Sequence, residues 1–315
     1  MRFFLFGWLF LSAGALAQLS APQPPSVIGK AWLVIDVTSE QVLAAERAEE
    51  RFEPASLTKL MTAYLVFAAM KENKLTPERV VPVSEKAWRA PGSRMFIEPN
   101  RPVTVDELIR GMVVQSGNDA CVALAEAVAG SEEAFAQLMN REAARLGMKS
   151  SRFANASGLP DAQHYSTARD LALLAMALVR DFPEQYAQYY SMREYRYNNI
   201  TQMNRNRLLW LDASVDGMKT GYTEAAGYCL VASSKRGPRR MLSVLLGSSS
   251  EATRAQESQK LLNWGFLFFD SVKLYEKGQA VRSIEVYKGA AREVKAGVNR
   301  MVETTVLVVP SITLT

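Results

Sequence analysis

Apolar residues form short runs near both ends of the chain, and these runs indicate β-strands. Between Lys30 and Leu43, an apolar run Ala-Trp-Leu-Val-Ile-Asp-Val is followed by Thr-Ser-Glu-Gln and a second apolar pair, which predicts two strands about a turn. Residues 228–234 and 241–247 are two further apolar runs, and the charged segment 235–240 separates them as a turn would. We therefore expect a second hairpin in the C-terminal half of the chain.

The middle of the chain shows helical spacing of apolar residues instead. Helix signals accompany this spacing: Ser131 begins one apolar face, Gly147 ends it, and Thr167 with Asp170 forms a capping box ahead of another. The segments that these patterns predict as helical are 56–70, 118–129, 131–146, a helix after Thr167, and 251–269.

This order of elements predicts an α+β fold. Strands at both ends with helices between them suggest one antiparallel sheet, built from N-terminal and C-terminal segments and flanked by helices, with a helical subdomain. Beyond residue 270, alternation at 281–287 and 304–309 predicts short strands interrupted by glycines. That stretch is too short for an independent β-domain, so we expect a main domain over 18–270 and an incomplete C-terminal β-domain over 271–315.

The first residues have the composition of a secretory signal. Arg2 precedes an apolar run over 3–11, and Ala15 and Ala17 present small residues where a signal peptidase cleaves. The run is shorter than the ~18 apolar residues that a transmembrane anchor needs. We expect a signal peptide over 1–17 and an exported protein in the periplasm or on the outer face of the cytoplasmic membrane.

The amino-acid composition limits which ligands the protein can bind and which residue types can act in catalysis. The chain carries 37 Lys and Arg against 32 Asp and Glu, a balance too mild and too scattered to indicate nucleic-acid binding. It has one histidine, His164, and two cysteines. A zinc site draws mainly on His and Cys, and a Ser-His-Asp triad needs a histidine, so we expect no metal, no cofactor and a general base of another type. Cys121 and Cys229 are either a disulfide or two buried thiols.

Ser56-Leu57-Thr58-Lys59 is the one Ser-x-x-Lys in the chain, and it lies where a helix is predicted to begin. Residues three apart share a helix face, so the Ser56 hydroxyl and the Lys59 amine can touch. An amine becomes a base when burial and a second cation lower its pKa. The alternative is a serine cap followed by a solvent-facing lysine.

Two further motifs follow in order. Ser116-Gly117-Asn118 precedes the Ala-rich helix, and Lys219-Thr220-Gly221 precedes the strand near residue 228. Ser-x-x-Lys, Ser-Asp-Asn and Lys-Thr-Gly form the signature of class A β-lactamases and penicillin-binding proteins. This chain departs from it in the second motif, where Gly117 replaces the aspartate. The chain resembles the low-molecular-weight penicillin-binding proteins that act as serine D-alanyl-D-alanine carboxypeptidases, the peptidase S11 family, from about residue 30 to residue 269. Segments 54–62, 115–120, 157–161, 164–168 and 215–223 carry the resemblance.

The resemblance implies a serine β-lactamase/transpeptidase-like fold and a role for each motif residue. Ser56 would attack the carbonyl between the two terminal D-Ala residues of a peptidoglycan stem peptide, and Lys59 would take its proton. Ser116 would pass a proton to the departing D-Ala. The backbone amides of Ser56 and Tyr222 would form the oxyanion hole, and β-lactam antibiotics would acylate the same serine.

Substrate binding is implied for the remaining motif residues. Asn118 would hold the peptide backbone and bridge toward Lys59. Lys219 would lower the pKa of Lys59 and, with Thr220 and Gly221, bind the terminal carboxylate. Arg254 matches a carboxylate-binding arginine of the family, and its alternative is a surface arginine at a helix start. His164 is expected to be a hydrogen-bonding loop residue near the site.

Three other interpretations stay open at this stage. Residues 153–169 contain no glutamate of the kind that drives deacylation in class A β-lactamases, which makes a β-lactamase the weaker enzyme hypothesis. An endopeptidase acting on peptide cross-links would use the same residues. A non-catalytic penicillin-binding sensor would keep Ser56 but not turn over a peptide.

The C-terminal residues 306–315 are apolar without a charged face. Whether the protein attaches peripherally to the membrane is therefore an open question, and a shortened chain is one expectation.

Overall fold

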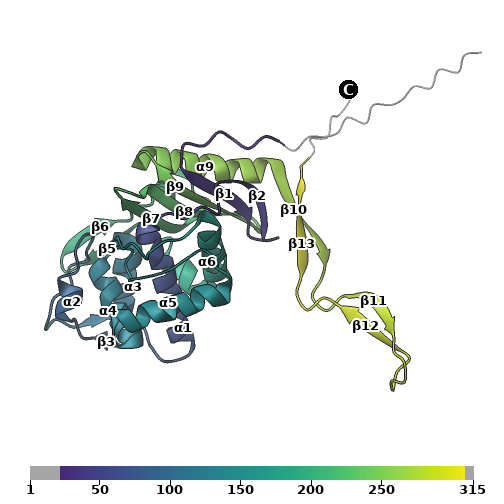
Figure 1. The fold of residues 1–315 in the computed structure, drawn as a ribbon, viewed down its shortest axis with the longest axis horizontal. Helices are drawn as coiled ribbons and strands as arrows, with labels where there is room; N and C mark the ends of the chain where they lie inside the picture. The colour runs from purple at the N-terminus through teal and green to yellow at the C-terminus, as the bar shows by residue number, and fades with distance from the viewer. Residues whose placement is uncertain (1–21, 309–315) are drawn as a thin grey trace, which may run out of the picture.

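Five antiparallel strands form the main sheet of the computed structural model, which describes residues 22–308 (Figure 1). Strand β1 of the N-terminal hairpin pairs with β9 of the C-terminal half, with Leu33 opposite Val244. The expected single sheet built from both ends of the chain is therefore confirmed. Its strands, in spatial order, are β2 (Gln41–Glu46), β1 (Ala31–Asp36), β9 (Arg239–Ser248), β8 (Gly227–Arg236) and β7 (Val215–Thr223).

The sheet is covered on both faces, which explains why every residue of β1 is buried. Helix α9 (Glu251–Phe268) lies along one face (Figure 1), where Trp32 packs with Leu261 and Trp264. On the opposite face Leu33 joins the larger core shared with the helical subdomain. Alternate side chains of one strand thus fill two cores.

The helical subdomain surrounds helix α1 (Lys59–Lys71), which contacts α4, α5 and α6. This explains why α1 is apolar on nearly all sides. The predicted helix from Ser56 begins differently from our expectation, because Ala55–Thr58 forms a 3-10 turn before the α-helix starts. The remaining helices are α2 (Glu85–Trp88), α3 (Val105–Arg110), a π-helical turn (Gly111–Gln115), α4 (Asn118–Ala129), α5 (Glu132–Leu146), α6 (Ala168–Asp181), α7 (Pro183–Tyr189) and α8 (Leu208–Leu211).

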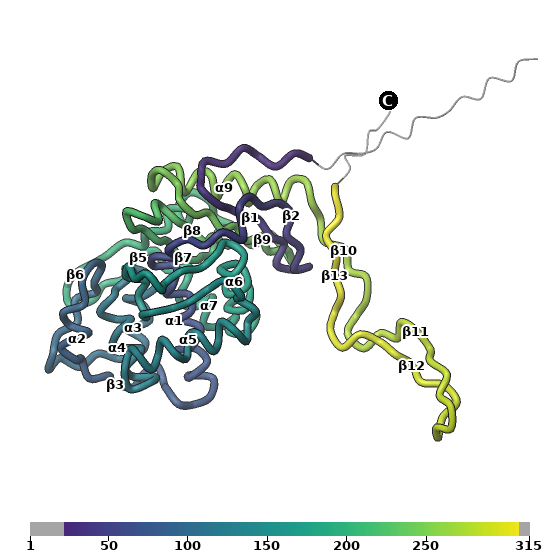
Figure 2. The backbone as a smooth tube through the Cα atoms, in the orientation of Figure 1, coloured from purple at the N-terminus to yellow at the C-terminus, as the bar shows by residue number. Residues whose placement is uncertain are grey.

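Four more strands follow α9 and project away from the main sheet (Figure 2). Strand β10 (Phe269–Tyr275) pairs with β13 (Val302–Leu307), and β11 (Ala280–Glu285) pairs with β12 (Glu293–Gly297). The strands expected at 281–287 and 304–309 correspond to β11 and β13, although residue 309 lies outside the described residues. Strands β10 and β12 were not predicted. Asp36 of β1 accepts hydrogen bonds from Ser271 (2.7 Å) and Thr305 (3.1 Å), which ties this arm to the sheet.

Two short hairpins complete the described structure: β3 (Val80–Val81) with β4 (Val103–Thr104), and β5 (Glu194–Tyr197) with β6 (Ile200–Met203). Both cysteines are buried and free, so the interpretation as two thiols holds. The expected signal over residues 1–17 lies outside the described residues. Within 22–308, none of the helices has the length and apolar character needed to cross a bilayer.

Candidate active site

Ser56 and Lys59 meet at the junction between the 3-10 turn and α1. The Lys59 Nζ lies 2.9 Å from the Ser56 Oγ, as the three-residue spacing predicts. Ser56 is partly exposed, whereas Lys59 is 1% exposed. The alternative of a solvent-facing lysine behind a serine cap is therefore wrong. No side chain forms a capping hydrogen bond at the start of this turn, so the Ser56 hydroxyl stays available to the Lys59 amine.

Three oxygen atoms surround the Lys59 amine. Besides Ser56, the Nζ contacts the Asn118 Oδ1 at 2.7 Å and the Ser157 carbonyl at 2.6 Å. The amide oxygen and the carbonyl can only accept hydrogen bonds, whereas a hydroxyl can also donate one. A neutral amine has two hydrogens and one lone pair, so it satisfies Asn118 and Ser157 as a donor and Ser56 as an acceptor.

The pKa of Lys59 is lowered, chiefly by burial and further by the positive charge of Arg205, while Cys121 and Asp119 act in the opposite direction. A charged ammonium loses hydration when it is buried, and this favours the neutral amine. A lowered pKa and contact with the hydroxyl that would lose its proton are the properties that a general base needs at this position.

Lys219 is buried on β7, the strand that carries the Lys-Thr-Gly motif. It is 3% exposed and donates a hydrogen bond of 3.0 Å to the Thr220 carbonyl. Burial lowers its pKa well below the ordinary lysine value, and the charges of Lys59 and Arg205 lower it further. Two buried amines that repel each other resist being charged together, so protonation of either one favours the neutral form of the other.

Ser116 holds an unusual position at the end of the π-helical turn. Its φ of 65° is left-handed, a conformation that costs a non-glycine residue about 1 kcal/mol or more. The Oγ atom is buried and has no hydrogen-bond partner among residues 22–308. A buried unpaired hydroxyl is unfavourable, and such groups in native proteins often serve a ligand or a reaction.

Asn118 begins α4 two residues later and is fixed at both ends of its amide. Its Oδ1 accepts from Lys59, and its Nδ2 donates to the Pro91 carbonyl at 2.6 Å. The amide is therefore oriented by Pro91 before any substrate binds. Asn155 orients the loop that carries Ser157. Its Oδ1 accepts a hydrogen bond from the Gly158 amide at 2.7 Å, and this bond helps to hold the Ser157 carbonyl in place.

Most of the predicted residues line one cleft that encloses about 200 Å³. Gly221 permits a close approach of β7 to the segment before Ser56, since an added Cβ would lie 3.1 Å from the Pro54 carbonyl oxygen. This approach brings the backbone of Tyr222 toward that of Ser56. The predicted residues lining the cleft are Ser56, Ser116, Asn118, Thr220, Gly221, Tyr222 and Arg254.

Two arginines, Arg205 and Arg254, line the cleft. Arg254 is 3% exposed and donates to the backbone carbonyl of Arg205 at 3.3 Å. Its interpretation as a surface arginine is wrong, since α9 begins against the cleft. Burial lowers the pKa of Arg254, although a guanidinium keeps its charge at neutral pH. The sequence analysis missed Arg205 and assigned no role to Ser157, although Ser157 belongs to a segment that carries the resemblance.

His164 is buried beside the site without touching Ser56. Its Nε2 lies 2.8 Å from the Thr58 Oγ1, and its Nδ1 accepts from the Ala154 amide at 3.4 Å. Burial lowers its pKa to about 4, so the ring is neutral near pH 7. The prediction of a hydrogen-bonding loop residue is confirmed. Among residues 22–308, no group of three or more His, Cys, Asp or Glu side chains is placed to hold a metal ion.

Comparison with known proteins gives consistent matches. A family model described as D-alanyl-D-alanine carboxypeptidase, peptidase S11, matches residues 18–250. The chain is 45% identical over 298 residues to D-alanyl-D-alanine carboxypeptidase DacC of Escherichia coli (strain K12), which covers 92% of this chain and 74% of that protein. It is 38% identical over 265 residues to DacF of Bacillus subtilis (strain 168), covering 82% of this chain and 68% of that protein.

Solved structures of penicillin-binding proteins have the same fold as this chain. Penicillin-binding protein 5 from Haemophilus influenzae superposes with a TM-score of 0.88 at 39% identity, covering 91% of this chain and 85% of that chain. Penicillin-binding protein D2 from Listeria monocytogenes in its ampicillin-bound form gives a TM-score of 0.71 at 31% identity, covering 78% of this chain and 100% of that chain.

Proposed function

The chain belongs to the peptidase S11 family of D-alanyl-D-alanine carboxypeptidases, and we propose that it removes the terminal D-Ala from peptidoglycan stem pentapeptides through an acyl-enzyme on Ser56. The observation that carries this proposal is the contact of 2.9 Å between the Ser56 Oγ and the buried, low-pKa amine of Lys59. No histidine or metal is needed, because the amine itself accepts the proton.

Acylation begins when Lys59 takes the hydroxyl proton and the Ser56 Oγ attacks the carbonyl of the penultimate D-Ala. The backbone amides of Ser56 and Tyr222 would stabilise the resulting oxyanion, and each such donor contributes about 3 kcal/mol to transition-state stabilisation. The close approach of β7 at Gly221 to the segment before Ser56 supports this assignment, since Ser56 and Tyr222 both line the cleft.

The departing D-Ala must gain a proton as its C–N bond breaks. Ser116 is assigned the relay of a proton to that nitrogen, because its buried Oγ has no competing partner among the described residues. Asn118 holds the substrate backbone while its Oδ1 orients Lys59. Water then hydrolyses the ester on Ser56 and releases the shortened peptide.

The terminal carboxylate of the substrate is assigned to the end of the cleft that Thr220, Arg205 and Arg254 line. A guanidinium matches a carboxylate with two parallel hydrogen bonds. Lys219 precedes Thr220 on β7 and adds a positive charge near the bound carboxylate when its amine is protonated. A bound carboxylate favours the protonated form of Lys219, and the protonated Lys219 in turn favours the neutral form of Lys59 that accepts the serine proton.

β-Lactam antibiotics would acylate the same serine, since they present a strained amide and a carboxylate to the same groups. The ampicillin-bound form of the Listeria monocytogenes relative supports this. We further propose that residues 1–17 are a cleaved signal and that the enzyme is exported to the periplasm or to the outer face of the cytoplasmic membrane. In this assignment residues 18–270 form the catalytic domain and 271–315 a separate C-terminal β-region.

The direct test measures D-alanine release from an acyl-D-Ala-D-Ala peptide, beside a cross-linked muropeptide and with penicillin labelling in parallel. We expect release from the linear peptide and labelling at Ser56, both abolished in Ser56→Ala. Preferential cleavage of the cross-linked substrate would indicate an endopeptidase. Labelling without any release would indicate a sensor.

A further inference from the structure

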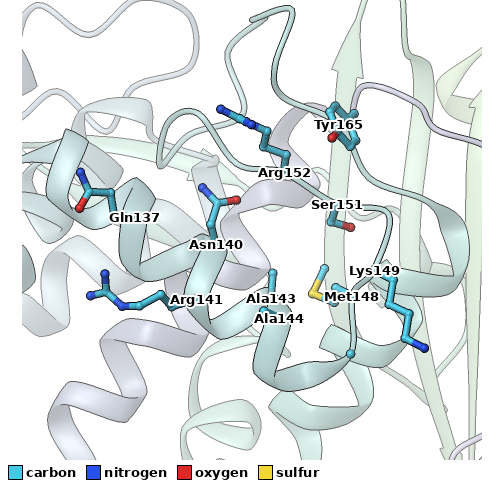
Figure 3. Close-up of a pocket in the computed structure, with 11 residues that line it drawn as sticks. Gln137, Asn140, Arg141, Ala143, Ala144, Met148, Lys149, Ser151, Arg152 and Tyr165 are labelled. Carbon is cyan, nitrogen blue, oxygen red and sulfur yellow. The ribbon is translucent and has the colours of Figure 1, made fainter.

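A second cavity, unrelated to the nucleophile, opens beside the C-terminal half of α5. It encloses about 810 Å³, which is larger than the active-site cleft. Figure 3 shows the side chains of α5 on one side and those of the following loop on the other. We call it the basic groove and define it by its lining residues: Gln137, Asn140, Arg141, Ala143, Ala144, Gly147, Met148, Lys149, Ser151, Arg152 and Tyr165.

All charged side chains that line the basic groove are positive. Arg141, Lys149 and Arg152 line it, and its lining includes no carboxylate. All three cations are exposed, and none forms an ion pair with another residue of 22–308. Arg51 adds a fourth positive charge at the rim, with its guanidinium 4.4 Å from the centre of the Tyr165 ring. Most other arginines of the described structure have a carboxylate partner, so the charges of this cluster are left available to an external anion.

One carboxylate lies behind the groove without neutralising it. Asp170 is buried, and its Oδ2 accepts from the Ser150 amide at 2.8 Å and from the Ser151 hydroxyl at 2.7 Å. These bonds fix the loop backbone. Asn140 fixes it from the other side, because its Nδ2 donates to the Phe153 carbonyl at 2.7 Å and its Oδ1 accepts from the Phe153 amide at 2.9 Å. The groove is thus held in shape before a ligand binds, which lowers the entropic cost of binding.

The chemistry of the lining favours a carboxylate-bearing peptide over a lipid surface. Two guanidinium groups suit carboxylates, amide and hydroxyl groups suit a peptide backbone, and Ala144 with Met148 offers a small apolar floor. A membrane-binding surface needs large exposed apolar side chains beside its cations. The large apolar side chains that are exposed in residues 22–308 all lie outside segment 137–165.

The same loop reaches both sites. Residues 147–149, 151–152 and 165 line the basic groove, whereas Ser157, Gly158 and Leu159 of that loop line the active-site cleft. We propose that the basic groove is a second binding site for the polymeric substrate, where Arg141, Lys149 and Arg152 bind carboxylates of a stem peptide other than the one being cleaved. This inference rests on the proposed function, because that function makes a polymer with repeated carboxylate-bearing peptides the substrate.

Binding is measured on the full chain carrying Ser56→Ala, so that the polymer is not processed. The probe is soluble peptidoglycan of several repeats, either with free carboxylates or with its carboxylates amidated. The groove variant adds Arg141→Ser and Arg152→Ser. The matched control adds Lys277→Ser and Arg292→Ser, which remove two exposed cations from the β11–β12 hairpin region. Thermal unfolding verifies that all variants fold.

We expect the groove variant to lose about tenfold or more in affinity for the free-carboxylate polymer, since it lacks two guanidinium groups that would each bind a carboxylate. The control variant should bind as the parent does, and the amidated polymer should not distinguish the variants. An equal loss in the control, or no loss in the groove variant, would overturn the proposal. Binding of phosphatidylglycerol vesicles through these arginines, without polymer binding, would also overturn it.

This test separates the inference from the proposed function. D-Alanine release from a short acyl-D-Ala-D-Ala peptide reports on the active-site cleft alone. If the short peptide is hydrolysed and the groove variant binds polymer like its parent, only the second site is wrong. If no D-alanine is released from any substrate, the proposed function itself is wrong.

Discussion

Replacement of Ser116 by alanine is expected to stabilise the protein and to disable it. The Ser116 Oγ is buried and has no hydrogen-bond partner among the described residues. A buried polar group without a partner costs about 1–3 kcal/mol, and its removal recovers part of that cost. The left-handed backbone at φ 65° is as unfavourable for alanine as for serine, so it does not offset the gain.

We estimate a gain of about 1 kcal/mol, which corresponds to a rise of roughly 2–4 °C in Tm for a domain of this size. D-Alanine release should fall about 100-fold or more, because proton transfer by a positioned group contributes at least that factor. The assays are thermal unfolding and steady-state D-alanine release, measured on the same preparation.

Ser258→Ala is the matched control. Its Oγ is also buried without a hydrogen-bond partner in the described part of the chain, but it lies in α9 outside the cleft lining. It should raise Tm by a similar amount and leave D-alanine release unchanged. A fall in Tm for Ser116→Ala beside a rise for Ser258→Ala would refute the claim that the Ser116 hydroxyl is unsatisfied. Unchanged release would refute its role as a relay.

Three further predictions concern the charged groups of the cleft. Lys59→Met should fold but acylate with penicillin at least 1000-fold more slowly in a stopped-flow assay, because the serine loses its base. Arg205→Gln should move the acidic limb of the acylation pH profile to higher pH: the guanidinium lowers the pKa of Lys59, so its loss raises that pKa and the amine becomes neutral only at higher pH. Arg254→Gln should lower kcat/KM roughly 10–100-fold for a peptide with a free terminal carboxylate and much less for its amide, as compared in parallel assays.

The elements that carry the motifs could be predicted from the sequence because their signals are local. The spacing of Ser56 and Lys59 determines their contact in a 3-10 turn as well as in an α-helix, so the error in helix type did not affect the pair. The apolar run of β1 and the turn before β9 likewise depend on neighbouring residues, and the single sheet built from both ends of the chain followed from the distribution of strands, whereas the strand order was not predicted.

Arg205 could not be predicted because its position depends on a tertiary contact. The segment that contains it is anchored by Asn206, whose Nδ2 donates to the Gly217 carbonyl on β7 at 3.0 Å. No local pattern encodes that bond. The exposure of Arg254 was also undecided in the sequence, since it depends on how α9 packs beside the cleft. The basic groove combines residues of α5 with Tyr165, and helical spacing alone does not bring these together.

The central claim is that Lys59 is a neutral amine that takes the proton of Ser56. Its most direct test is the rate of Ser56 acylation by penicillin as a function of pH, followed by intact-mass spectrometry. We predict that the rate falls as pH decreases through an apparent pKa below the ordinary lysine value of 10.5, since protonation removes the lone pair of the base. A rate that continues to rise through pH 10.5, as for an unperturbed lysine, would contradict the claim.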